Sequence, residues 1–292
     1  MKFAFVSAEQ VAFPIAVTCR LLGVSTSGYY AWKGRPGSSR SLRDLELGDR
    51  VRAAHDASSG RYGSPRVHAE LRATGERVGR KRVARLMKEA GLAGRMRRRF
   101  RKTTDSNHAF PIAPNVLERD FSATAPNQAW VTDITYLWTR EGWLYLAVML
   151  DLFSRRVVSW ATSPSIDRHL ALVALRAALR DRRPDAGLVH HSDRGSTYAS
   201  GDYRSALETH AIECSMSRKG DCWDNAVTET LFGSLKVERL HGMHFATRRQ
   251  AKDEVIDWLQ FYNHRRLHST LGYLSPMAFE KKRLADKERL AA

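Results

Sequence analysis

Apolar residues recur at helical spacing through the first hundred positions of the chain. The spacing predicts four short helices, at residues 14–22, 27–32, 64–74 and 80–90. The first two flank a turn at Gly23, which fits either a helix-turn-helix or a plain α-hairpin. In the last helix, Val83, Leu86 and Met87 would face a core and leave the basic side chains outward.

The period changes to that of β-strands after residue 127. Aromatic and β-branched runs predict five strands, at residues 130–138, 144–150, 156–161, 188–192 and 211–216. Further helices are predicted at residues 167–181, 202–209, from 224 onward and around 258–262. Turns separate the first three strands, which should form an antiparallel meander. The order predicts an α/β fold, with a mixed five-stranded sheet flanked by helices.

The chain is strongly basic. Lys and Arg number 48 against 31 Asp and Glu, a formal net charge of +17, which favours a polyanionic partner such as DNA. No apolar run approaches the roughly 20 residues of a membrane span, and the apolar start lacks a signal cleavage site. We expect a cytoplasmic, nucleoid-associated protein with no membrane partner. Cys19, Cys214 and Cys222 form no C-x-x-C pair and are expected to be reduced bystanders.

Composition and periodicity divide the chain into five regions. They are a helix-turn-helix-like segment at 1–40, a basic helical DNA-binding domain at 41–102, a linker at 103–122, the α/β core at 123–264 and a tail at 265–292. The linker contains Thr, Asn, Ala and Pro and shows no clear period.

The basic charge is densest between Arg80 and Lys102. This stretch holds 11 basic residues and one acid, Glu89, which indicates a surface that faces phosphates. The predicted DNA contacts are Arg80, Lys81, Arg82, Arg85, Arg97, Arg98, Arg99, Arg101 and Lys102. The part from Arg95 onward is expected to be an arm that orders on DNA, with a solubilising linker as the alternative.

Three acidic residues occupy positions that favour a chemical role. Asp133 lies mid-strand, where Asp is disfavoured and a half-buried carboxylate is costly. Asp193 follows a strand end, where ligands bind in α/β sheets. Glu229, Phe232 and Lys236 are spaced to share one face of a predicted helix. Together the acids and the lysine suit a site for metal and phosphate.

Carboxylate oxygens are the ligands that hard divalent cations prefer. A pair of such ions can activate a nucleophile and hold the leaving oxygen of a phosphodiester. No glycine-rich phosphate loop accompanies these residues. Cutting and joining of nucleic-acid backbones is therefore favoured over nucleoside triphosphate hydrolysis.

Other charged residues have simpler interpretations. Asp151 is a rival for the first carboxylate, but Arg155 and Arg156 offer it a local ion pair, so a structural turn is favoured. Arg265 and Arg266 follow the apolar stripe of the predicted final helix and are expected to be free to touch phosphate.

The histidines are expected to be structural. His190 should pack beside its strand, and His191 should orient the loop that carries Asp193. His264 and His268 have zinc-like spacing, but no second pair of ligands accompanies them.

Three runs of residues resemble the motifs of a known family. They are Trp130-x-x-Asp133-Ile134-Thr135-Tyr136, His191-Ser192-Asp193-Arg194-Gly195-Ser196-x-Tyr198, and Ser217-x-Lys219-Gly220-Asp221-Cys222-x-Asp224-Asn225-Ala226-x-x-Glu229-x-x-Phe232-x-x-Leu235-Lys236. The chain is similar in these runs to the integrase-core DDE transposases, in particular to the second-frame (OrfB) protein of the insertion-sequence-three family. Segments 61–92 and 262–276 also resemble that protein, so the likeness covers most of the chain.

The resemblance implies a ribonuclease-H-like fold of the retroviral-integrase type, with an integrase catalytic core at 123–264. Asp133, Asp193 and Glu229 would be the metal-binding catalytic triad, and Lys236 a DNA contact near the cleaved phosphate. Family members cut the 3′ ends of their element and join them to target DNA with magnesium ions, which is polynucleotidyl transfer.

The implied partners are the terminal inverted repeats of an insertion element, target DNA, further copies of this chain in a homo-oligomer on DNA, and an upstream-frame protein or a frameshift fusion with it. Trp223 stands where Tyr is frequent in the family and Thr230 where Ser is frequent, and neither change removes a metal ligand. Two alternatives remain. One is a ribonuclease-H-like nuclease that cuts without joining, and the other is an inactive or domesticated copy that only binds DNA.

Overall fold

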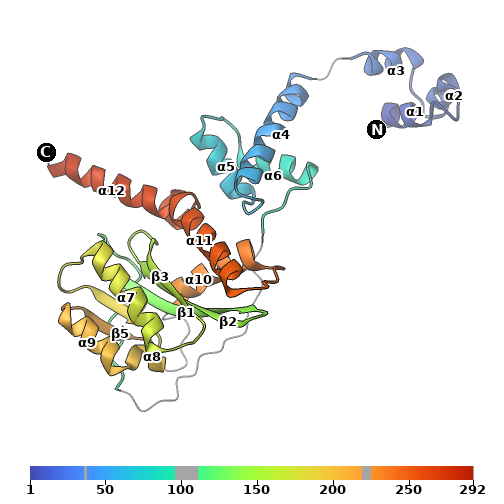
Figure 1. Cartoon of the computed structure of the whole chain (residues 1–292). Coiled ribbons are helices and arrows are strands. Elements are labelled where there is room, and N and C mark those ends of the chain that lie inside the picture. Colours follow the sequence, from blue (N-terminus) through green and yellow to red (C-terminus); the bar gives the residue numbers. More distant parts are fainter. Residues whose placement is uncertain (36–37, 96–110, 219–224, 292) are drawn as a thin grey trace.

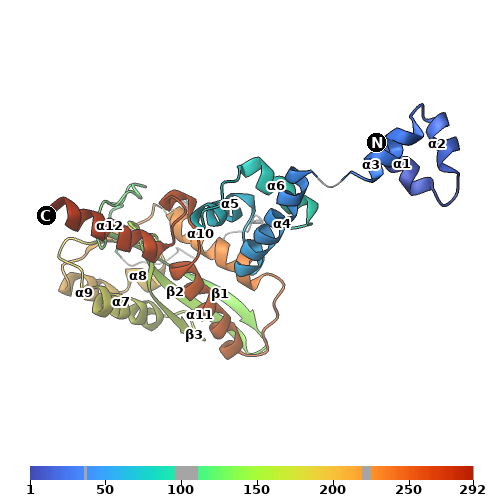
Figure 2. The same ribbon diagram turned by 90° about the horizontal axis from the view of Figure 1, so that it is seen from above.

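The computed structural model describes residues 1–35, 38–95, 111–218 and 225–291 (Figure 1). These residues form two small helical units followed by an α/β core and its C-terminal helices (Figures 1 and 2). Within the described ranges, no helix has both the length and the apolar character needed to cross a bilayer.

The first helical unit contains α1 (Lys2–Glu9), α2 (Ile15–Leu21) and α3 (Thr26–Lys33). Val6, Cys19 and Tyr29 form its small buried core. Ser25 begins α3 because its side chain accepts a hydrogen bond from the Gly28 N–H at 3.0 Å. The predicted helix pair is therefore confirmed, and α1 is a helix that the spacing did not predict.

The second helical unit contains α4 (Ser39–Ala57), α5 (Ser64–Ala73) and α6 (Arg80–Glu89). Helices α5 and α6 were predicted, and Val83, Leu86 and Met87 are buried as expected. Helix α4 was missed because its apolar positions are sparse: only Leu47 and Val51 among them are buried.

The core contains one five-stranded sheet, with the strands in the order β3-β2-β1-β4-β5. The strands are β1 (Ala129–Thr139), β2 (Gly142–Asp151), β3 (Val157–Ser163), β4 (Val189–Ser192) and β5 (Glu213–Met216). β1 pairs with β2 and β2 with β3 in antiparallel fashion, whereas β4 is parallel to both β1 and β5. The predicted mixed sheet, with its antiparallel meander, is confirmed.

Helices cover both faces of the sheet, as the ribbon shows (Figure 1). The covering helices are α7 (Arg168–Arg182), α8 (Ser196–Ala199) and α9 (Gly201–Thr209) on one face and α10 (Ala226–Leu235) and α11 (Arg248–His264) on the other. Trp130 packs with the first group and Val131 with the second, because successive side chains of a strand point to opposite faces. The sheet is therefore buried on both sides.

The chain continues after α11 with a further helix, α12 (Pro276–Ala291), in the segment predicted as a tail. Glu280 of α12 forms ion pairs with Arg156 and Arg182 of the core. Trp258, which was predicted to be core, is fully buried. Arg266, which was predicted to be free, is 6% exposed and bound to a carboxylate, so that prediction was wrong.

Candidate active site

The pairing of β1 with β4 brings Asp133 and Asp193 to one place. The parallel register ends with Val131 opposite His191, and β4 stops at Ser192. Asp133 and Asp193 each lie two residues beyond that last pair, on neighbouring strands that run the same way. Two acidic residues far apart in sequence thus meet at the point where β4 ends. Beyond this point, β4 no longer pairs with that edge of β1.

The electrostatics of Asp133 reflect this clustering. Burial raises the pKa of the Asp133 carboxyl well above its usual value, and the nearby charges of Asp193 and Glu229 raise the pKa further. A hydrogen bond from the Ile134 N–H to Asp133 Oδ1, at 2.7 Å, opposes these effects. The carboxylates therefore repel one another, and a cation would relieve that repulsion.

The loop after β4 holds Asp193 through short-range contacts. The Gly195 N–H donates to Asp193 Oδ1 at 2.9 Å. His191 lies 2.8 Å from Ser215 Oγ through Nδ1 and 3.1 Å from Ser217 Oγ through Nε2, which ties the end of β4 to β5. These bonds fit the predicted orienting role of His191.

Gly195 approaches the side chain of Asp193 closely. A Cβ at position 195 would lie 2.9 Å from Asp193 Oδ1, so the carboxylate would have to shift, although φ of −63° there suits alanine. For the phosphodiester cleavage that the sequence predicts, we expect Gly195→Ala to displace the carboxylate and lower the rate by about 100-fold, the scale of a misplacement near 1 Å. Thermal melting should stay within a few degrees, roughly the range of a surface change.

The control for this prediction is Gly201→Ala, since a Cβ at position 201 meets nothing within 4 Å. Cleavage rates and melting curves of the two variants would be compared. Equal rates in both variants would show that the placement of Asp193 does not matter.

Glu229 is carried by α10, whose first turn is anchored to β1 beside Asp133. The Asn225 side chain donates to the Thr132 carbonyl at 3.4 Å, and Thr228 Oγ1 donates to the Asn225 carbonyl at 2.9 Å. Asn225 was quoted in a motif, but its anchoring role had no signal in the sequence. Phe232, predicted to share a helix face with Glu229, is buried in the core, whereas Glu229 is half-buried. The expected cap at position 224 lies outside the described residues.

Lys236 lies where α10 gives way to a π-helical turn, η2 (Lys236–Leu240). Its Nζ is 5.3 Å from the centre of the Tyr136 ring. Burial lowers the pKa of the Lys236 ammonium, while the phenol of Tyr136 and the charge of Asp133 act to raise it. The lysine is therefore a cation beside the carboxylate cluster, although η2 was not predicted.

A cavity of about 560 Å³ opens onto Asp133 and Asp193. Its lining includes Asp133, Tyr136, Trp143, Asp193 and Tyr198. Tyr198, which is buried, approaches Thr132 Oγ1 with its hydroxyl at 3.3 Å and so supports the strand beside Asp133. The site thus combines carboxylates with aromatic walls and room for a polymer backbone.

The donor set fits a hard divalent cation, because the clustered ligands are carboxylate oxygens. In the part of the chain that the structure describes, no three His, Cys, Asp or Glu side chains are grouped closely enough to hold one ion together. Neighbouring strands bring the carboxylates of Asp133 and Asp193 together.

Asp151, the rival carboxylate, has a structural role. It is fully buried and accepts hydrogen bonds from the Asn127 and Phe153 N–H groups, both at 2.8 Å. Its ion-pair partner is Arg182, at 3.4 Å, in place of the expected neighbours in the turn. This carboxylate is therefore satisfied without a metal.

His190 and His268 have structural roles. His190 is buried and lies 2.9 Å from the Tyr203 hydroxyl, and burial lowers its pKa to about 3. His268 packs edge-on to the Tyr262 ring, and burial lowers its pKa to about 2. His264 is exposed.

The predicted DNA contacts have different surroundings. Arg80 and Lys81 are exposed in the first turn of α6. Arg82 and Arg85 form ion pairs with Asp44, each at 2.6 Å. Arg97, Arg98, Arg99, Arg101 and Lys102 lie outside the described residues, as does Cys222.

Comparisons with known proteins agree with this architecture. Two protein-family models, both described as integrase core domain, match residues 123–222 and 210–276. A third family model, described as HTH-like domain, matches residues 42–100. The transposase InsF for insertion sequence IS3A of Escherichia coli (strain K12) is 43% identical over 288 residues, covering 98% of this chain and 100% of that protein. The insertion element IS600 uncharacterized 31 kDa protein of Shigella sonnei is 46% identical over 265 residues, covering 90% and 97%. Among solved structures, the HTLV-2 integrase catalytic core domain in complex with magnesium has a TM-score of 0.42 at 15% identity, covering 55% of this chain and 99% of that one.

Proposed function

Because the chain belongs to the family of IS3-type insertion-sequence transposases, we propose that it cuts the 3′ ends of its element and joins them to target DNA by metal-dependent phosphoryl transfer. The observation that carries this proposal is the parallel register of β1 and β4, which places Asp133 beside Asp193. Helix α10 adds Glu229 from the third motif. These three residues form the proposed catalytic triad.

The carboxylates would hold two magnesium or manganese ions. When bound, such ions activate an attacking water or 3′-hydroxyl and stabilise the leaving oxygen. Asp133 would contribute to both ions, Asp193 to one and Glu229 to the other. Lys236 would bind a phosphate next to the cut, since its ammonium lies beside the carboxylates.

The basic N-terminal region, which includes the predicted DNA-binding domain at 41–102, would bind the terminal repeats. Its partners in this proposal are DNA, further copies of this chain and an upstream-frame protein or fusion. The support is the match of an HTH-like domain to residues 42–100 and the net charge of +17.

The test is a cutting and joining assay. Purified protein, with the upstream-frame product supplied, would be incubated with labelled duplexes carrying the terminal repeats that flank its gene, with magnesium or with EDTA. We expect magnesium-dependent cuts at the 3′ ends and covalent joining of those ends to a second DNA. Cutting without joining would indicate the nuclease alternative, and binding without either would indicate a DNA-binding remnant.

The exposed basic pair of α6 allows a quantitative prediction. Replacing Arg80 and Lys81 with Ala should weaken DNA binding and reduce the slope of log K against log salt by about 2, since each lost phosphate contact removes about 0.9. Lys281→Ala with Lys282→Ala removes the same charge from an exposed part of α12 and is the control. Binding would be titrated at several salt concentrations. Equal slopes for the two double variants would mean that α6 does not contact DNA.

A further inference from the structure

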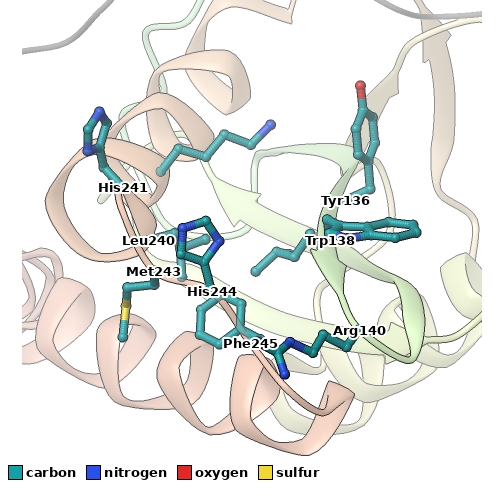
Figure 3. Close-up of a pocket in the computed structure, with 10 residues that line it drawn as sticks. Tyr136, Trp138, Arg140, Leu240, His241, Met243, His244 and Phe245 are labelled. Carbon is teal, nitrogen blue, oxygen red and sulfur yellow. The ribbon is translucent and has the colours of Figure 1, made fainter.

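A second cavity, of about 490 Å³, lies beside the catalytic one (Figure 3). One wall is the C-terminal half of β1, and the other is the segment 240–245 that follows α10. Figure 3 shows Tyr136 and Trp138 on the strand side and His241 and His244 across from them. The volume is within the range of about 300–1,000 Å³ for small-ligand pockets.

The strand wall presents aromatic rings to solvent. Trp138 is 60% exposed and Tyr136 is 39% exposed, although large apolar side chains are normally buried. Trp138 is held by an edge-on contact with Trp143, with ring centres 4.7 Å apart. An exposed, fixed aromatic ring is a surface on which a nucleobase can stack.

The charge of the cavity suits a phosphate. Lys236 and Arg140 line it together with His241 and His244, and the described lining residues include no carboxylate. A nucleotide carries the two complementary features, a flat base and a negative phosphate. The aromatic wall and the basic rim therefore select for nucleic acid over an apolar peptide or a lipid chain.

The cavity adjoins the proposed catalytic site. Tyr136 lines both cavities, and the Lys236 ammonium lies 5.3 Å from its ring centre. A nucleotide whose phosphate lies against Lys236 is therefore beside the carboxylates.

The two walls are also joined to each other. The Arg140 N–H donates to the Phe245 carbonyl at 3.0 Å, and Thr139 and Phe245 form an isolated parallel bridge. The segment 240–245 is thus attached to the end of β1, so the cavity is formed before any ligand arrives.

We propose that this cavity receives one unpaired DNA base from a nucleotide adjacent to the phosphate that is cut, with the base stacked on Trp138. The proposal rests on the proposed function and adds a requirement to it, namely that the duplex opens locally at the element end. A paired base cannot enter, because its faces are already stacked in the helix.

The test measures binding in EDTA, so it does not depend on catalysis. Duplexes carrying the terminal repeat would be fully paired or would contain two mismatched pairs at the cleavage position. We expect the protein to bind the mismatched duplex about tenfold more tightly, because the energy of unpairing is already supplied. Trp138→Leu should lose this preference and Trp138→Phe should keep it, since only an aromatic ring stacks.

A second measurement uses the unaltered chain. A 2-aminopurine at the mismatched position should be protected from acrylamide quenching in the complex, and one placed in an unpaired site ten pairs away should not. Equal binding of both duplexes, an equal preference in the Leu and Phe variants, or no protection would overturn the proposal. Asp133→Asn should retain the preference, so failure of the catalytic assignment is distinguished from failure of this one.

Discussion

Asp133→Asn is expected to lower the rates of DNA cutting and joining by at least about 10³-fold. The substitution keeps the size of the side chain but removes a charge that, in our account, both metal ions require, and a loss of about 4 kcal/mol of transition-state stabilisation corresponds to that factor. DNA affinity should change little, because the basic N-terminal region that is proposed to bind DNA does not include Asp133. The measurement is the single-turnover rate with labelled element ends, together with a binding titration.

Asp202→Asn is the matched control for this change. Asp202 is an exposed carboxylate of α9 that forms an ion pair with the exposed Arg168 at 3.2 Å. Removal of its charge should leave the rates of DNA cutting and joining within about twofold of those of the unaltered protein, since a surface ion pair contributes little energy. Comparable losses in the two variants would mean that the charge of Asp133 has no special role.

Glu238→Ala is expected to lower the free energy of unfolding by about 3–5 kcal/mol, the cost of removing one partner of a buried ion pair. Glu238 and Arg266 both have side chains that are 7% exposed. The Arg266 guanidinium donates to Glu238 Oε1 at 2.7 Å and to Oε2 at 2.9 Å. Removal of the carboxylate leaves a buried guanidinium without its charge partner. Urea unfolding followed by tryptophan fluorescence measures the loss.

Glu254→Ala provides the comparison. Glu254 pairs with Arg239 on a more exposed part of α11, with side chains 27% and 24% exposed, so its loss should cost no more than about 1 kcal/mol. The double variant Glu238→Leu with Arg266→Met should recover much of the stability, because the buried guanidinium is removed together with its partner and only the half-buried Arg66 loses an ion pair. A loss of less than 1 kcal/mol for Glu238→Ala would contradict this account of the pair.

Glu238 also lies where the second helical unit meets the core. Tyr62 donates its hydroxyl hydrogen to the Arg265 carbonyl at 3.0 Å and accepts the Leu267 N–H at 2.9 Å. Arg66 donates to the Leu267 carbonyl at 2.9 Å and lies 3.8 Å from the Glu238 carboxylate. The HTH-like domain is therefore in contact with η2, which follows α10, and with residues 265–267, which follow α11.

The strand pattern predicted much of the core. The residues around Val131 are mostly β-branched or aromatic, a composition typical of strands, so the position of Asp133 within a strand could be predicted. The parallel pairing that brings Asp193 beside it was not predicted, because β2, β3 and α7 lie between β1 and β4 and local periodicity does not say which strands pair. The pattern thus indicated the mixed sheet but not the meeting of the two acids.

Long-range pairing and weak patterns account for the errors. Arg266 looked free because its partner, Glu238, is 28 positions away and no local rule connects them. Helix α4 was not predicted because apolar residues are sparse in it and charged residues are frequent.

The most direct test of the central claim is to detect excised, joined element ends in cells that carry a marked element. The native chain would be compared with Asp193→Asn, with the upstream frame supplied in both. The account predicts junctions with the native chain and none with the variant. Junctions that survive the substitution would contradict the assignment of Asp193 to the catalytic triad.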